Sequence, residues 1–246
     1  MCLILFAIAP NDGLKLVVAA NRDEQHARPT LAANYWLDDP GTLGGRDLQA
    51  GGTWLGVTKS GRFAAVTNFA EEPPDPLPPR SRGDLTSDFL RRDISCRDYL
   101  AEVQHKDQEY RGFNLVISDG EVVFYYSNRE KQIRQLPSGF YGLSNQLLDC
   151  NWPKVISARQ HLMQCANNNF GNDTLFELLA CRGDETPFSA RFILGEHYGT
   201  CTSTIVKMTG TEVYFEERGF SAEGTHIATN QFEIALSRQL PQVLSE

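Results

Sequence analysis

Cys2 is the residue of this sequence with the clearest potential for covalent chemistry. Methionine aminopeptidases remove an initiator methionine that precedes a small residue, so cleavage after Met1 would give Cys2 both a thiol and a free α-amine. An α-amine with a pKa of roughly 8 can take the proton of a thiol with a pKa of about 8.5, and such a nucleophile needs no histidine. Taken alone, Cys2 is more simply interpreted as a small apolar side chain at the start of a buried strand.

The polar quartet Asn21–Glu24 is the second chemical feature, and a predicted hairpin brings it close to Cys2. The apolar runs Cys2–Ala9 and Leu14–Ala20 flank turn residues at 10–13, which is typical of a buried β-hairpin. Cys2 and the quartet are about equally far from that turn, so we expect them at the same end, with the quartet on a loop after the strand. The arginine of the quartet would favour a thiolate and its aspartate could orient the amine; a surface salt-bridge cluster is the alternative.

Three further residues could complete a site of this kind. Asn68 and Asn145 each follow a predicted strand, where an amide group can donate a hydrogen bond to an oxyanion. Each could equally be a turn former, which is the commoner role of asparagine. Arg191 is an isolated cation in an otherwise weakly charged stretch.

The elements that would position these residues come as strands in hairpins, with helices in pairs between them. Further strands are predicted at Thr53–Thr58, Arg62–Phe69, Phe113–Ser118, Val122–Ser127, Phe140–Ser144, Thr202–Met208, Glu212–Glu216 and Thr225–Thr229. Helices are predicted after Asp84, at Cys96–Gln104, from Pro153 to Ala166, at Leu175–Ala180 and from Phe232 onward. This order favours an α+β fold of antiparallel sheets covered by helices, in one domain over residues 1–246.

Some local expectations accompany this assignment. Asp84 and Asp173 are predicted to cap the helices that follow them. Residues 21–52 are expected to be polar and irregular after the first hairpin. The segment Glu71–Arg82 holds five prolines, which predicts an exposed loop.

Composition narrows the classes of function. A net charge of -8 argues against a broad nucleic-acid surface, and the first apolar run is too short for a signal peptide or a membrane span. We therefore expect a cytoplasmic protein with no stable membrane insertion. The six cysteines include no C-x-x-C pair, so reduced thiols and no metal site are expected.

Several short motifs, in order over most of the chain, resemble the NRDE family, also called the transport and Golgi organisation protein 2 family. They are Cys2, Asn21–Glu24 with Arg28–Thr30, Gly51–Gly56, Thr67–Phe69, Ser81–Asp84, Gly112–Leu115, Tyr141–Asn145 and Trp152–Val155. One departure is Cys201, at a place where the family pattern usually has arginine.

A more distant resemblance is to the choloylglycine hydrolase and penicillin acylase group of N-terminal-nucleophile hydrolases, which implies an αββα sandwich. Carried over position by position, the catalytic set that it implies is Cys2, Arg22, Asp23, Asn68, Asn145 and Arg191. The aspartate departs from the pattern, because these hydrolases separate their arginine and aspartate by more residues.

The resemblances lead to two hypotheses of function and a third, simpler one. The NRDE family implies intracellular haem trafficking, by a protein that needs no cofactor and carries haem or a lipid-like acyl compound as cargo beside Cys2. The ligand-contacting set would be Asn21, Glu24, His26, Arg28, Trp54 and His197. The residues themselves favour a Cys2 hydrolase or acyltransferase acting on an amide or thioester. The third hypothesis is a non-catalytic interaction protein that uses the proline-rich segment.

Overall fold

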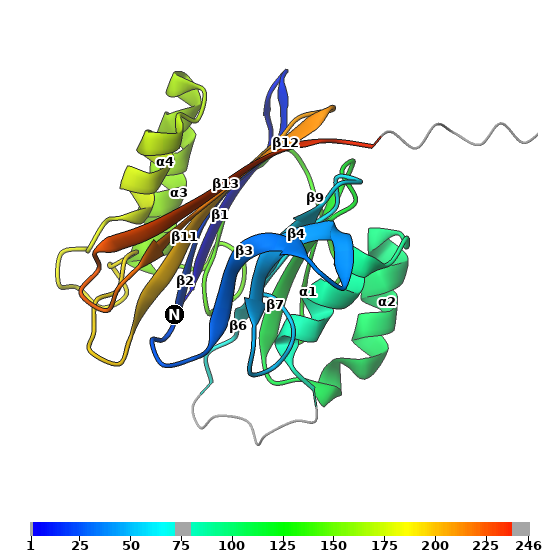
Figure 1. Cartoon of the computed structure of the whole chain (residues 1–246), viewed down its shortest axis with the longest axis horizontal. Helices are drawn as coiled ribbons and strands as arrows, with labels where there is room; N and C mark the ends of the chain where they lie inside the picture. The colour runs from blue at the N-terminus through cyan, green and yellow to red at the C-terminus, as the bar shows by residue number, and fades with distance from the viewer. Residues whose placement is uncertain (1, 72–79, 238–246) are drawn as a thin grey trace, which may run out of the picture.

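The computed structural model describes residues 2–71 and 80–237, which form two antiparallel sheets covered by helices (Figure 1). The first sheet has the order β10 (Gly139–Leu143), β1 (Leu3–Asn11), β2 (Leu14–Gln25), β11 (Tyr198–Met208), β12 (Glu212–Phe220) and β13 (His226–Ala235). The second has β3 (Thr30–Trp36), β4 (Asp39–Asp47), β5 (Leu55–Thr58), β6 (Phe63–Asn68), β7 (Phe113–Ser118), β8 (Val123–Ser127) and β9 (Arg134–Leu136).

The helices lie on the outer faces of the two sheets. Helices α3 (Pro153–Cys165) and α4 (Asn172–Leu179) pack on the first sheet, and α1 (Arg82–Arg91) and α2 (Cys96–Lys106) pack on the second. Short 3-10 turns, η1 (Asp107–Glu109) and η2 (Ala166–Asn168), follow α2 and α3. The layers are therefore αββα, and the predicted fold class is confirmed.

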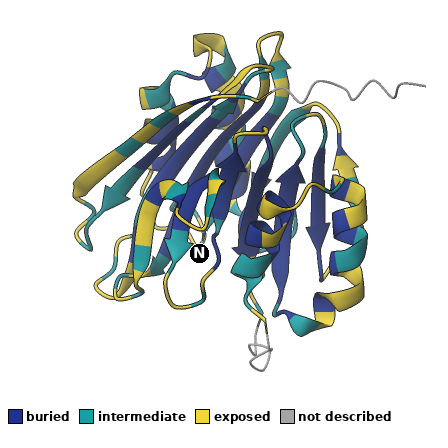
Figure 2. Ribbon diagram, turned by 45° about the vertical axis from the view of Figure 1, so that its right-hand side comes forward, coloured by how far each residue is buried: buried dark blue, intermediate teal, exposed yellow. Residues whose placement is uncertain are grey.

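The central strands of each sheet are buried on both faces, which explains their apolar runs without alternation. On β1, Ile4 and Phe6 face the other sheet, whereas Leu3 and Leu5 pack under the helices. Figure 2 shows the buried residues continuing through the central strands of both sheets. A strand that is buried on both faces appears in the sequence as a continuous run of apolar residues.

The predicted opening hairpin is confirmed, and its register sets the position of the site. Leu3 pairs with Asn21, so Cys2 lies beside the start of the quartet. The quartet itself was wrongly expected on a loop, because β2 continues through Gln25. The reason is β11, whose residues from Tyr198 onward pair with this end of β2 and supply its backbone hydrogen bonds.

Four other expectations need correction. Residues 21–52 are not irregular but contain β3 and β4, whose glycines and polar residues conceal the strand pattern. The segment from Phe232 is not a helix but the end of β13, with Phe232 paired with Phe215 of β12. Helix α1 is capped by Ser81 rather than Asp84, and α4 begins after Gly171 without a side-chain cap from Asp173.

The short edge strand β9 was not predicted, and it pairs with β8. The expected exposed loop at 71–82 falls largely on residues 72–79, which lie outside the described residues, and α1 already begins at Arg82.

Candidate functional site

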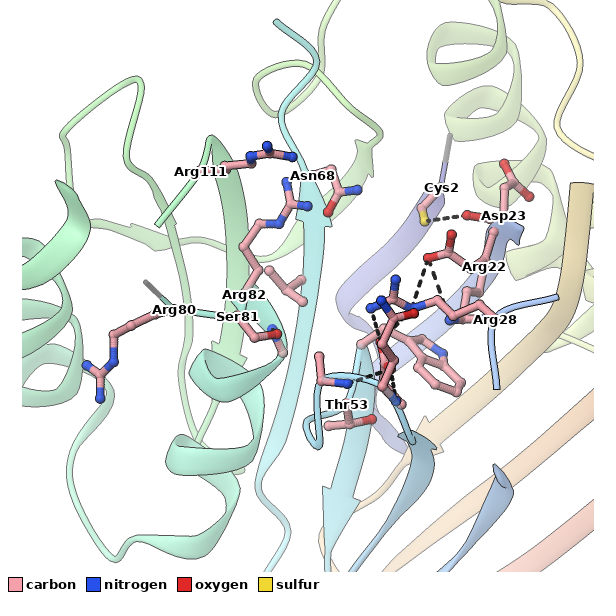
Figure 3. A pocket seen from close by; sticks show the side chains of 17 residues that line it. Cys2, Arg22, Asp23, Arg28, Thr53, Asn68, Arg80, Ser81, Arg82 and Arg111 are labelled. Atoms are coloured by element: carbon pink, nitrogen blue, oxygen red, sulfur yellow. Dashed lines mark hydrogen bonds and ion pairs between the residues drawn. The ribbon is translucent and has the colours of Figure 1, made fainter. Parts of the chain in front are cut away.

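A pocket of about 410 Å³ lies where the β1–β2 hairpin begins, between the first sheet, the second sheet and the start of α1 (Figure 3). Of the residues singled out in the sequence, those that line it are Cys2, Arg22, Asp23, Glu24, Arg28, Trp54 and Asn68. Those that do not line it are Asn21, His26, Asn145, Arg191 and His197. The structure thus brings together residues from the two ends of the first hairpin and from the second sheet.

Strand alternation sends the side chains of the quartet to opposite faces of the first sheet. Arg22 faces the second sheet, where its guanidinium lies 4.3 Å from the centre of the Trp54 ring and 3.7 Å from a Glu24 carboxylate oxygen. Trp54 fits there because Gly45 has no side chain, and a Cβ atom at that position would overlap the indole ring. Arg28 joins the same wall through an ion pair with Asp47 at 2.7 Å.

Asp23 points the other way, toward the helices of the first sheet. Its carboxylate accepts a hydrogen bond from the Thr200 hydroxyl at 2.7 Å, and its carbonyl oxygen accepts one from the Tyr198 hydroxyl at 3.1 Å. Burial raises the pKa of the Asp23 carboxyl, although the Thr200 hydrogen bond and the charge of Lys154 oppose this shift. Asp23 is therefore a rigidly held carboxylate beside Cys2.

The Cys2 thiol lies 3.8 Å from the carbonyl oxygen of Asp23, and the Cys2 carbonyl accepts a hydrogen bond from Ser144 at 2.7 Å. Burial raises the pKa of the Cys2 thiol and outweighs the opposing charges, of which Arg22 is the smallest contributor. Arg22 thus favours the thiolate, as expected, but its effect is smaller than that of burial. Desolvation is the stronger effect because Arg22 is directed toward Trp54 and Glu24.

The two asparagines have different surroundings. Asn145 is buried, and its amide donates to the carbonyl oxygen of Asn68 at 2.8 Å, which uses one of its two N–H bonds. Asn68 is exposed at the pocket wall, and within residues 2–71 and 80–237 its side chain makes no hydrogen bond. Asn145 thus fixes the end of β6, and Asn68 presents an amide to the pocket.

Asn21 and Arg191 lie behind the first sheet, away from the pocket. The Asn21 amide donates to the carbonyl oxygens of Arg191 and Leu179 at 2.8 and 3.0 Å. The Arg191 guanidinium donates to the Leu178 carbonyl at 3.0 Å and to the Ser157 hydroxyl at 3.1 Å. Both residues tie β2 to the segments around α3 and α4.

The two histidines proposed as ligands are also outside the pocket. The His26 ring is 3.0 Å from the Gly195 carbonyl through Nε2 and 3.8 Å from the Cys201 sulfur through Nδ1. His197 is exposed, and its carbonyl oxygen accepts a hydrogen bond from the His26 backbone N–H. The departure at Cys201 therefore affects the region around His26.

Sequence reasoning missed two cationic features of the site. Lys154, in the second position of α3, is only 1% exposed, and it interacts electrostatically with Asp23 and Cys2. Arg82 and Arg111 line the wall opposite Cys2. Lys154 lies in the motif Trp152–Val155, and Arg82 lies in the motif Ser81–Asp84. The charged residue in each motif could have indicated a role at the site.

Comparisons with known proteins agree with this architecture. Residues 1–222 match the family described as Transport and Golgi organisation 2. The chain belongs to this family. A mouse Transport and Golgi organization 2 homolog is 32% identical over 275 aligned residues, which cover 96% of this chain and 99% of the mouse protein. A human homolog is 36% identical over 182 residues, covering 69% of this chain and 66% of the human protein.

The fold is shared more widely than the Transport and Golgi organisation 2 family. A Caenorhabditis elegans ortholog of N-acylethanolamine-hydrolyzing acid amidase superposes with a TM-score of 0.53, covering 83% of this chain and 92% of that protein. The two are 13% identical, so the likeness concerns the fold. Both predicted resemblances, to the family and to the N-terminal-nucleophile hydrolase fold, are confirmed.

No helix among the described residues is long and apolar enough to cross a membrane. Residues 2–71 and 80–237 also contain no group of three or more histidine, cysteine, aspartate or glutamate side chains that could hold a metal ion.

Proposed function

We propose that the protein is a hydrolase or acyltransferase in which Cys2, freed by removal of Met1, attacks an amide or thioester. The observation that carries the proposal is the grouping of three residues around one pocket: Cys2, Asp23, whose carboxylate is buried on the helix side, and Asn68. These groups supply a nucleophile, an anchor for its α-amine and a donor for an oxyanion. The amidase named among the similar folds adds support of the same kind.

The proposed reaction has two stages. The α-amine of Cys2 accepts the thiol proton, and the thiolate attacks the carbonyl carbon of the substrate. Asn68 donates a hydrogen bond to the oxyanion, and the C–N or C–S bond breaks as the ammonium returns its proton to the leaving group. Water, activated by the same amine, then hydrolyses the acyl-Cys2 thioester; a different nucleophile would give acyl transfer. Asp23 would hold the ammonium during both stages.

The test combines intact mass with turnover of N-acyl aminocoumarins, N-acylethanolamines and acyl thioesters. We expect a mature chain that begins at Cys2, an acyl adduct on Cys2, and a loss of turnover of roughly a hundredfold or more in Cys2→Ser. Cys150→Ser, which changes a half-buried thiol outside the pocket, is the matched control. Retention of Met1 in active protein, or full turnover in Cys2→Ser, would contradict the mechanism.

Haem carriage is the second candidate, favoured by the arginines that face Cys2 across the pocket. Arginine can pair with haem propionates, and a cysteine thiolate can ligate haem iron. Because neither His26 nor His197 lines the pocket, Cys2 is the residue we propose as the axial ligand. A stoichiometric Soret shift that is lost in Cys2→Ala would support this role, and weak uptake unchanged by the substitution would contradict it.

Both candidates concern a small amphipathic ligand and a cytoplasmic protein. Fractionation of cells that express the full chain tests the location separately, since either activity could be measured on the purified protein. The hypothesis of a non-catalytic interaction protein depends on the proline-rich segment, which lies mostly outside the described residues.

A further inference from the structure

Two arginines from different parts of the second sheet's layer lie on the pocket wall opposite Cys2. Arg82 is the first residue of α1, and Arg111 lies just before β7. In Figure 3 their guanidinium groups lie next to each other and to Asn68, whereas Arg80 is directed away from them. The wall opposite Cys2 therefore presents cationic groups beside the proposed oxyanion donor.

Arg82 differs from its neighbours in how its charge is balanced. Arg22, Arg28 and Arg80 each have a carboxylate oxygen within 4 Å. Among the described residues Arg82 has no such ion pair, and its guanidinium donates one hydrogen bond, to the Gly112 carbonyl at 3.2 Å. Burial, and after it the charge of Arg111, lower the pKa of Arg82, but a guanidinium stays charged in proteins.

The backbone of this wall is held firmly. Gly52 and Gly83 approach so closely that a Cβ atom at Gly52 would overlap the backbone of Gly83. The Thr86 hydroxyl donates to the carbonyl oxygen of Thr53, which fixes the first turn of α1 against the loop before β5. The bond from Arg82 to Gly112 ties the same turn to the residue that follows Arg111. The Arg82 guanidinium is therefore held at the pocket wall without a carboxylate partner among the described residues, and a bound anion would balance its charge.

We propose that Arg82 and Arg111 form an anion subsite that selects substrates carrying a carboxylate or phosphate group near the bond that Cys2 attacks. Planar guanidinium groups bind both anions through paired, charge-assisted hydrogen bonds. The subsite rests on the proposed function for its substrate class: an anionic amide or thioester, not a neutral one. Its position beside Asn68 would place the anion on the side of the pocket that receives the oxyanion.

Alkylation of Cys2 tests the subsite without requiring turnover. Iodoacetate and iodoacetamide react in the same way: the thiolate attacks the methylene carbon and iodide leaves. Both reagents react with the same thiolate. The rate with iodoacetate divided by the rate with iodoacetamide therefore does not depend on how far the thiol is ionised. We expect this ratio to be roughly tenfold higher at Cys2 than at the exposed Cys181 of the same chain, since a cationic pocket concentrates the anionic reagent.

The substitutions Arg82→Gln and Arg111→Gln should bring the ratio at Cys2 close to that at Cys181. Arg80→Gln is the matched control, because Arg80 lines the same pocket but pairs with Glu109, and it should leave the ratio high. Circular dichroism confirms that each variant is folded. An unchanged ratio in folded Arg82→Gln would overturn the subsite.

Inorganic phosphate separates the two anion classes. Protection of Cys2 from iodoacetamide by phosphate, lost in Arg82→Gln, would assign a phosphate group. A preference for iodoacetate without phosphate protection would assign a carboxylate. The outcome is independent of the proposed function: an Arg82-dependent preference in a protein without turnover supports the subsite alone, and turnover without that preference overturns the subsite alone.

Discussion

The two faces of the first sheet at the end of β2 carry different parts of one polar motif. On the helix side, Asn21 and Asp23 are buried in fixed hydrogen bonds to neighbouring segments. On the side of the second sheet, Arg22 and Glu24 line a pocket through looser contacts, a ring stack and an ion pair at 3.7 Å. Four consecutive residues thus provide both the support and the lining of the site.

Neighbouring residues of this motif therefore have different roles. Strand alternation assigns Asn21 to structure and Arg22 to the pocket, and it leaves Asp23 between the two roles because Cys2 lies against its backbone. The comparison predicts that substitutions on the helix side change stability most. Substitutions on the pocket side should change the reactivity of Cys2 most.

The largest expected effect is on stability, from Arg191→Met on the helix side. Arg191 is 7% exposed, and its loss would leave the Leu178 carbonyl and the Ser157 hydroxyl without their donor. We expect the free energy of unfolding to fall by about 3 kcal/mol, measured by urea denaturation.

Arg22→Met is the matched variant on the pocket side. Arg22 is also 7% exposed, but it caps no backbone carbonyl among the described contacts. Its loss should cost about 1 kcal/mol. Equal losses in the two variants would show that the two faces do not differ as proposed.

The next effect concerns Glu217 of β12, the buried carboxylate on the side of the second sheet. Glu217 is 1% exposed and accepts a hydrogen bond from the Ala33 backbone N–H at 2.7 Å. Burial raises the pKa of Glu217 to about 6, although the Ala33 bond and the charge of Arg22 oppose the shift. The folded state therefore binds this proton more tightly than the unfolded state, so the contribution of Glu217 to stability falls as pH rises from about 4.5 to 6.

Glu217→Gln should remove this pH dependence while it keeps an oxygen for Ala33. Relative to the unsubstituted protein, the variant should be more stable by about 2 kcal/mol at pH 7 and by less than about 1 kcal/mol at pH 5. Urea denaturation at the two pH values measures the difference. A variant that is less stable at pH 7 would mean that the Glu217 charge is favourable where it lies.

The sequence predicted the side of the site that depends on local pairing. Equal distances from one turn were enough to place Cys2 beside Asn21–Glu24, and the end of a strand was enough to bring Asn68 to the surface. The prediction assigned all of Asn21–Glu24 to one loop, because nothing local to β2 indicates that β11 will pair with it. The face of the first sheet on which each of these side chains lies could be assigned only after β11 was known to pair with β2.

The opposite wall could not be predicted from local patterns. Arg82 and Arg111 are 29 positions apart in the chain numbering and meet through the close approach of Gly52 to Gly83 and the bond to Gly112. Helical periodicity predicted a helix from Pro153 to Ala166, in which Val155 is a core residue, but it gave no reason for a buried charge at Lys154. Packing between layers, which brings distant segments together, decides these positions.

The smallest expected effect is on the ionisation of Cys2, and it comes from Lys154 on the helix side. Burial lowers the pKa of Lys154, while its electrostatic contacts with Asp23 and Cys2 favour its charged form. By symmetry its charge favours the Cys2 thiolate, so Lys154→Met should slow alkylation of Cys2 by iodoacetamide roughly threefold at neutral pH and displace the rate profile to higher pH.

Lys154→Arg should retain most of the rate, because it keeps the cation. Lys207→Met is the control for loss of a lysine, since Lys207 is partly buried against Tyr214 and does not line the pocket. If Lys154→Met and Lys207→Met give the same rate profile as the unsubstituted protein, Lys154 has only a packing role. The helix side would then support the site through hydrogen bonds alone, and the division between the two faces would be sharper than proposed.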